Sequence, residues 1–162
     1  MPALKNKKMK PVLNTTIKVT KIFTFEMAHA LLGYDGDCRN IHGHSYKLHV
    51  AIVGKPLQQP GHPKDGMVID FKQLKEIVKK GVILPYDHAL VLNERTSPES
   101  IASLKKINQK LILKPFQPTC ENLLLEFIQK VQPGLPNGVE LFGMKLYETA
   151  SSYSEWENAN LK

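Results

Sequence analysis

Two stretches of period-two alternation, each carrying histidine, limit what this chain can fold into. Apolar residues fill most odd positions of residues 16–29, and His29 closes that series. Residues 42–53 alternate in the same way and begin with His42 and His44. Because residues i and i+2 of a strand face the same side, we predict two adjacent strands whose three imidazoles converge.

Three converging imidazoles form a candidate metal site. Three protein nitrogens leave zinc one open position, which is typical of catalytic rather than structural zinc. Cys38 lies four residues before the histidine pair, in a loop rich in glycine and aspartate, and could act as a fourth ligand or as a thiolate base. An isolated H-x-H pair is common in strands, so the prediction depends on all four residues together. His49 and His62 match no such pattern and are predicted to face solvent.

Turn and cap residues divide the rest of the chain into the elements of an α+β domain. After the two strands we predict a helix capped by Asp70 and ended by Gly81, a helix from Ser97, a strand over residues 111–113, a helix capped by Thr119 and a last strand over residues 139–148. A sheet of four strands leaves its edges unpaired, and exposed edges invite pairing with further copies of the chain.

Length and charge favour a single domain with a basic tail. The 162 residues carry a formal net charge of +7, and four lysines fall within the first ten residues. We therefore expect residues 1–15 to form a disordered tail and residues 16–162 one catalytic domain. No apolar stretch approaches the ~20 residues that cross a bilayer. The two cysteines form at most one bridge, so we expect reduced thiols and a cytoplasmic protein. We expect no nucleic-acid and no membrane partner.

Six short motifs follow one another between residues 16 and 150. They are Phe25-Glu26-Met27-Ala28-His29, Cys38-x-x-x-His42-Gly43-His44, Met67-Val68-Ile69-Asp70-Phe71 with Leu74-Lys75, Asp87-His88 with Leu92-Asn93, Pro118-Thr119-Cys120-Glu121-Asn122, and Tyr147-Glu148-Thr149. In this order they resemble the family of 6-pyruvoyl-tetrahydropterin and 6-carboxytetrahydropterin synthases. The resemblance implies the tunnelling fold, a four-stranded antiparallel sheet with helices on one face. It also implies trimers that stack into homohexamers, with active sites between subunits.

The short gap between Cys38 and His42 resembles the bacterial 6-carboxytetrahydropterin synthases of queuosine biosynthesis more than the pyruvoyl enzymes, in which this gap is longer. The resemblance implies conversion of 7,8-dihydroneopterin triphosphate to 6-carboxy-5,6,7,8-tetrahydropterin, with loss of triphosphate and side-chain carbons. The chain departs from the short bacterial members in its N-terminal tail and in an enlarged segment over residues 93–117. A 6-pyruvoyl-tetrahydropterin synthase is the nearest alternative. A non-catalytic zinc-binding module is a more distant one, disfavoured because no basic and aromatic residues interleave.

The resemblance also assigns roles to single residues. His29, His42 and His44 would hold Zn²⁺, Cys38 would be the general base, and Asp87 and His88 would move protons from across a subunit boundary. Glu148 would bind the amino edge of the pterin, and Thr119, Cys120 and Glu121 would line its pocket. Structural alternatives stay open: Cys38 could be a small buried residue, and Glu121 could only stabilise the first turn of its helix. For the triphosphate, the sequence offers Arg39 and surface lysines.

Overall fold

The computed structural model describes residues 15–107 and 110–161, so the predicted tail lies almost wholly outside the described residues. The strands are β1 (Ile17–His29), β2 (His42–Gly54), β3 (Ala89–Asn93), β4 (Leu111–Lys114), β5 (Val139–Tyr147) and β6 (Tyr153–Glu157). The α-helices are α1 (Phe71–Val78), α2 (Leu84–Tyr86), α3 (Pro98–Lys106) and α4 (Cys120–Val131). Short turns are η1 (Asp37–Arg39), η2 (Lys79–Ile83), η3 (Gln132–Gly134) and η4 (Ala159–Leu161). Within these ranges, no helix is long and apolar enough to span a membrane.

The described strands form one mixed sheet of six strands in the order β4-β3-β1-β2-β5-β6. β1, β2, β5 and β6 pair antiparallel, whereas β3 and β4 extend the sheet in parallel from the end of β1. The α+β class and the antiparallel core agree with the prediction, but the count of four strands was wrong. The strand predicted over residues 111–113 belongs to the parallel extension, and the fourth antiparallel strand is β6.

The missing strand β3 has a physical explanation. All five of its residues are buried. A strand that is covered on both faces shows no alternation of apolar and polar residues in the sequence. The sequence patterns therefore did not distinguish it from a loop segment following Asp87 and His88.

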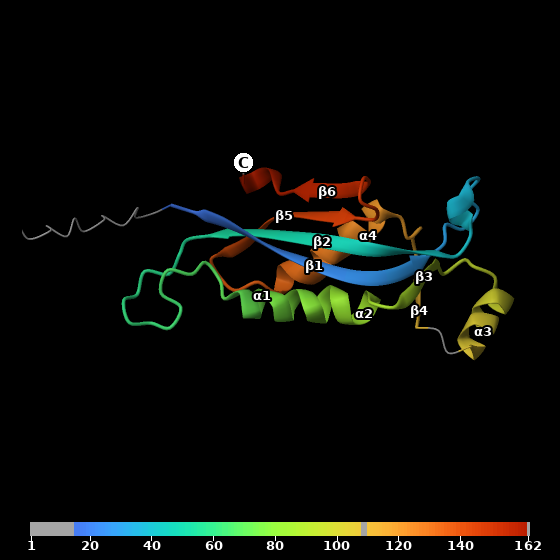
Figure 1. Cartoon of the computed structure of the whole chain (residues 1–162), viewed down its shortest axis with the longest axis horizontal. Helices are drawn as coiled ribbons and strands as arrows, with labels where there is room; N and C mark the ends of the chain where they lie inside the picture. Colours follow the sequence, from blue (N-terminus) through green and yellow to red (C-terminus); the bar gives the residue numbers. More distant parts are fainter. Residues whose placement is uncertain (1–14, 108–109, 162) are drawn as a thin grey trace, which may run out of the picture.

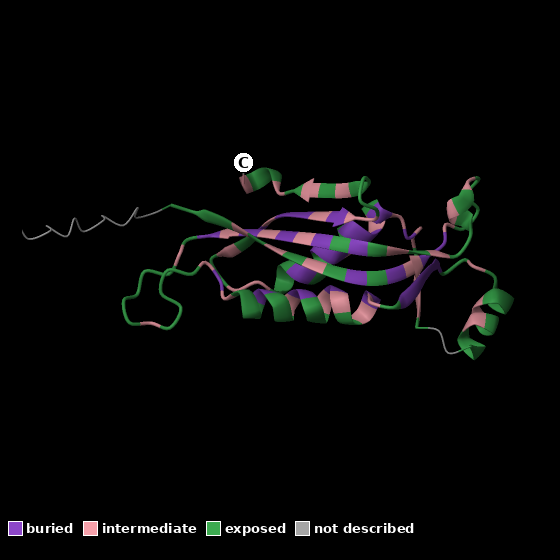
Figure 2. Ribbon diagram, in the orientation of Figure 1, coloured by how far each residue is buried: buried purple, intermediate pink, exposed green. Residues whose placement is uncertain are grey.

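The helices α1, α2 and α4 cover one face of the sheet, and α3 stands apart at one end (Figure 1). The core fills the space between these helices and the sheet. In it, the Phe25 ring stacks on Tyr46 with ring centroids 5.3 Å apart and meets Phe127 edge-on at 6.1 Å. Exposed and buried stripes alternate along the central strands (Figure 2), as expected for a sheet with one open face.

The helix that begins after Asp70 was predicted to end at Gly81, and this prediction was wrong. The helix continues through the π-helical turn η2 into α2 and ends at Tyr86. A Cβ at Gly81 would lie 3.3 Å from the carbonyl oxygen of Lys130 on α4. Glycine therefore allows two helices to approach closely at this point, rather than ending a helix through a left-handed conformation.

Candidate metal centre and catalytic site

The register of β1 and β2 brings the three predicted histidines together. His29 is paired with His42, and Met27 with His44, so all three imidazoles project from the ends of two adjacent strands. One ring nitrogen from each histidine lies within 4.8 Å of the others, and this is the one such metal-capable group among the residues that the structure describes. His29 is 2% exposed, whereas His42 and His44 are half-buried.

The unused nitrogens of this cluster suit a metal ion. Nδ1 of His29 donates to the carbonyl oxygen of Pro118 at 2.7 Å, and Nδ1 of His42 donates to that of Asn40 at 2.8 Å. Their Nε2 atoms then face each other at 3.2 Å, while Nε2 of His44 is buried without a hydrogen-bond partner in the described part of the chain. Histidines that bind a metal through one ring nitrogen commonly donate the N–H of the other nitrogen to a carbonyl oxygen in this way. The donor set therefore fits a divalent cation of the zinc type.

The electrostatics of the cluster favour neutral imidazoles, the form that binds metal. Burial lowers the pKa of His29, although the Pro118 carbonyl and Glu148 oppose this shift. Burial also lowers the pKa of His44, again against the charge of Glu148. Because neutral histidine keeps a lone pair on one nitrogen, these two residues are prepared for coordination at neutral pH.

Glu148 follows β5 directly, and its carboxylate reaches the histidine cluster. Oε1 lies 3.5 Å from Nε2 of His29 and 4.0 Å from Nε2 of His44. The hydroxyl of Tyr46, a fully buried residue, donates to the same oxygen at 3.3 Å. Burial is the main cause that raises the pKa of Tyr46, and the charge of Glu148 adds to it. Tyr46 was not predicted as a site residue, although it shares the strand face of His42 and His44.

Cys38 lies in the 3-10 turn η1, within the loop that joins β1 to β2 at the histidine end of the sheet (Figure 1). Its thiol is free and half-buried. The N–H of Leu31 donates to the Cys38 carbonyl oxygen at 2.8 Å, which closes the loop. The role of Cys38 toward a metal or substrate stays a prediction.

Asp87 and His88 lie at the edge of β1, directly before β3, and both contact the backbone of Glu26. Oδ1 of Asp87 accepts the N–H of Glu26 at 3.0 Å, and the N–H of His88 donates to the Glu26 carbonyl oxygen at 2.6 Å. Since strand side chains alternate, Glu26 points to the face opposite His29. The Asp87 carboxylate also lies 3.0 Å from Nδ1 of His88, whose side chain is 76% exposed. Among described residues, no hydrogen bond or ion pair joins this pair to the cluster.

The three residues predicted to line a pterin pocket lie at the start of α4. The Thr119 hydroxyl accepts the N–H of Asn122 at 3.3 Å as the helix cap. Cys120 is buried, and its thiol donates to the Leu146 carbonyl oxygen at 3.2 Å. Glu121 is exposed in the first helical turn, where a carboxylate favours the helix dipole. Their roles toward a ligand stay predictions.

One sequence expectation about another histidine changes with the structure. His49 is half-buried rather than solvent-facing: its ring packs against Tyr147 with centroids 5.3 Å apart, and its Nε2 is shielded from solvent.

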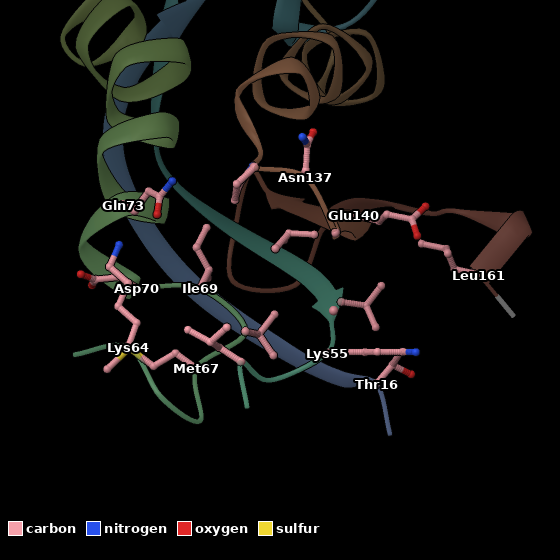
Figure 3. A pocket seen from close by; sticks show the side chains of 17 residues that line it. Thr16, Lys55, Lys64, Met67, Ile69, Asp70, Gln73, Asn137, Glu140 and Leu161 are labelled. Atoms are coloured by element: carbon pink, nitrogen blue, oxygen red, sulfur yellow. The ribbon is translucent and has the colours of Figure 1, made fainter. Parts of the chain in front are cut away.

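A cavity of about 600 Å³ lies at the end of β2 away from the three histidines. Its labelled lining includes Lys55, Lys64 and Asp70 (Figure 3). Among the described residues, this lining includes no histidine or cysteine, so the histidine cluster remains the candidate centre.

Comparison with known proteins agrees with this geometry. The family model described as 6-pyruvoyl tetrahydropterin synthase matches residues 18–159. The chain is 40% identical over 142 residues to 6-carboxy-5,6,7,8-tetrahydropterin synthase of Haemophilus influenzae, covering 86% of this chain and 98% of that protein. It is 31% identical to the protein of the same name from Rickettsia felis, covering 86% of this chain and 99% of that one.

Solved structures support the same fold. 6-Pyruvoyl tetrahydropterin synthase of Caenorhabditis elegans superposes with a TM-score of 0.64 at 22% identity, covering 90% of this chain and 97% of that one. The Plasmodium falciparum enzyme gives a TM-score of 0.64 at 20% identity, covering 90% and 99%. The fold is therefore the predicted α+β tunnelling fold. With a family model that spans most of the sequence and relatives above 30% identity, this chain belongs to the 6-pyruvoyl tetrahydropterin synthase family.

Proposed function

We propose that the chain is a zinc-dependent lyase that converts 7,8-dihydroneopterin triphosphate to 6-carboxy-5,6,7,8-tetrahydropterin, with loss of triphosphate and side-chain carbons. The observation that carries the proposal is the cluster of His29, His42 and His44 with a carboxylate beside it. Supporting it is the 40% identity to a protein named 6-carboxy-5,6,7,8-tetrahydropterin synthase, over 98% of that protein. The proposal includes a place for this product in queuosine biosynthesis. It also includes a cytoplasmic location for the enzyme.

His29, His42 and His44 would hold the metal. Zn²⁺ would supply a Lewis-acid charge that polarises oxygens of the substrate side chain and makes the adjacent C–H groups more acidic. The carbonyl groups of Pro118 and Asn40 fix the orientation of two of these rings. Ring orientation fixed in this way keeps the Nε2 lone pairs directed at one point.

Proton transfer falls to Cys38 and to the pair of Asp87 and His88. As a thiolate, Cys38 would accept a proton from a side-chain carbon of the substrate. His88 would deliver or remove protons at the neighbouring hydroxyl. Asp87 accepts from Nδ1 of His88 at 3.0 Å, which leaves Nε2 of that ring for the substrate.

Glu148 would recognise the pterin. A carboxylate can accept two parallel N–H groups, which matches the 2-amino group and N3–H of the ring. Oε1 of Glu148 already accepts the Tyr46 hydroxyl, so Tyr46 would hold the carboxylate in a fixed position. Thr119, Cys120 and Glu121, at the start of α4, would complete the pocket wall.

The assembly we propose is a homohexamer built from two trimers. β3 covers only Met27–His29 of the outer edge of β1, and β6 forms the opposite end of the sheet. Open edges of this kind can pair with those of other copies. Because no hydrogen bond or ion pair among the described residues joins Asp87 and His88 to their own histidine cluster, they would serve the site of a neighbouring copy.

Product analysis tests the proposed reaction. The zinc-loaded protein is incubated with 7,8-dihydroneopterin triphosphate, and the product is identified by mass. A 6-carboxytetrahydropterin supports the proposal. A 6-pyruvoyl product supports the alternative that the name of the matching family model favours. Unchanged substrate with metal bound would leave only a zinc-binding module.

A further inference from the structure

The side chain of Gln117 makes a two-point contact with the backbone of Leu32. Its Oε1 accepts the Leu32 N–H at 3.0 Å, and its Nε2 donates to the Leu32 carbonyl oxygen at 2.5 Å. An amide is the side chain that offers one donor and one acceptor in this spacing. The pair resembles one rung of a β-ladder, formed by a side chain instead of a strand.

Leu32 belongs to the loop that carries Cys38. The preceding residue, Leu31, donates its N–H to the Cys38 carbonyl oxygen at 2.8 Å. Leu32 itself is 41% exposed, so apolar burial contributes little to holding this part of the loop. The Gln117 amide is therefore a principal attachment of the Cys38 loop to the rest of the domain.

Gln117 is itself anchored next to the histidine cluster. Its carbonyl oxygen accepts the N–H of Thr119 at 2.8 Å and Nδ2 of Asn122 at 3.0 Å, which ties it to the start of α4. The next residue, Pro118, accepts Nδ1 of His29 at 2.7 Å. A single dipeptide thus contacts a residue of the metal cluster on one side and the Cys38 loop on the other.

From this geometry we infer that Gln117 is a positioning residue, which fixes the Cys38 thiol relative to the three histidines. The inference rests on the proposed role of Cys38 as the base. In this role Gln117 acts through the Cys38 loop, because both hydrogen bonds of its side chain go to the Leu32 backbone. What it controls is the distance between base and substrate, and displacement by about 1 Å can lower a rate about a hundredfold.

Hydrogen exchange tests the contact without reference to activity. In Gln117→Met the Leu32 amide loses its acceptor, and we expect it to exchange at least about tenfold faster than in the parent protein. The matched control is Gln129→Met, the same change on the exposed side of α4, which should leave exchange in the loop unchanged. Protection of Leu31 and Leu32 that survives in Gln117→Met would overturn the inference.

Turnover tests the consequence. We expect kcat of Gln117→Met to fall about 10- to 100-fold, with KM within about twofold and metal content unchanged, because substrate and metal contacts remain. Parent-like kcat together with a loosened loop would also overturn the inference. If Cys38→Ala retains full activity, the proposed base is wrong, and this result is separate from the exchange result on Gln117.

Gln117→Glu adds a pH-dependent test. The ionised carboxylate accepts from the Leu32 N–H but opposes the Leu32 carbonyl oxygen, whereas the protonated acid can donate to that oxygen. Relative to the parent at each pH, the activity of Gln117→Glu should therefore rise as pH falls from about 8 to 5.5, since a carboxyl beside a carbonyl has a raised pKa. The same ratio for Gln117→Met should stay flat. A flat ratio for both variants contradicts a role for the donor group.

Discussion

Oε1 of Glu148 lies 3.5 Å from Nε2 of His29, although the two residues come from opposite ends of the chain. They meet because β5 pairs with β2, and β2 with β1, which brings the end of β5 to the end of the sheet that carries the histidines. A candidate pterin anchor and a candidate metal ligand therefore share one small volume. Substitutions at these neighbouring positions should therefore have different effects: changes at the histidines should lower metal content, and changes at Glu148 should lower substrate affinity.

Metal content should depend on the histidines and not on Cys38. We expect about one zinc per chain in the purified protein, and loss of most of it in His42→Ala, because two remaining ligands make a poor site. Cys38→Ala should keep its zinc. Metal analysis of both variants checks this, and zinc loss in the cysteine variant would identify Cys38 as a ligand.

Substrate affinity should depend on Glu148. Glu148→Gln puts a donor opposite the amino edge of the pterin, and an opposed polar group costs about 1–3 kcal/mol, so affinity should fall roughly ten- to a hundredfold. Cys38→Ala and His88→Ala should keep affinity while kcat collapses. Titration calorimetry and steady-state kinetics separate the two effects. Should Glu148→Gln bind as tightly as the parent, the pterin anchor lies elsewhere.

Tyr46→Phe serves as the control for Glu148. It removes the hydroxyl that donates to Oε1 but keeps the carboxylate and its charge. We expect a smaller loss of affinity than for Glu148→Gln. An equal loss would mean that Tyr46, rather than the Glu148 charge, makes the decisive contact.

A shared active site predicts complementation between two inactive variants. Light scattering should give a trimer or hexamer for the parent. When Cys38→Ala and His88→Ala are unfolded together and refolded as mixed oligomers, roughly a quarter of the sites should combine an intact Cys38 with an intact His88 from another copy. Activity should return to about that level. A mixture that stays inactive, or an active monomer, would show that each site lies within one chain.

Glu126 should make stability depend on pH. Its carboxylate accepts the Tyr86 hydroxyl at 2.6 Å and pairs with Lys114. Burial alone would raise the pKa of Glu126, but hydrogen bonds from Lys114 and Tyr86 outweigh burial, and the pKa is lowered. A lowered carboxyl pKa contributes stability above its ordinary range, and this contribution is lost as pH falls through the folded-state value.

Glu126→Gln should therefore lower the free energy of unfolding by about 1–3 kcal/mol at pH 7. The difference from the parent should narrow below about pH 4, where the glutamate of the unfolded chain takes up its proton before the folded one does. Urea unfolding at several pH values measures this. A difference that stays constant down to pH 3 would mean that the charge of Glu126 does not stabilise the fold. Glu121→Gln, an exposed carboxylate on the same helix, is the control.

The sequence determined the features that depend on near neighbours. The alternation of residues 16–29 and 42–53 predicted β1 and β2 within one residue at each end. Asp70 and Thr119 were predicted as helix caps and Ser97 as the start of a helix, and each side chain accepts an N–H of the first turn. Strand periodicity also predicted that three imidazoles converge, since it needs only the side on which each residue lies.

Tertiary structure decided what depends on residues far apart in the chain. The contacts of Asp87 and His88 with the Glu26 backbone depend on the parallel pairing of β3 with β1. The contact of Glu148 with His29 depends on the pairing of three strands. The contact of Gln117 with Leu32 joins residues 85 positions apart in the chain. No local pattern encodes such contacts, because they result from strand register and helix packing over the whole domain.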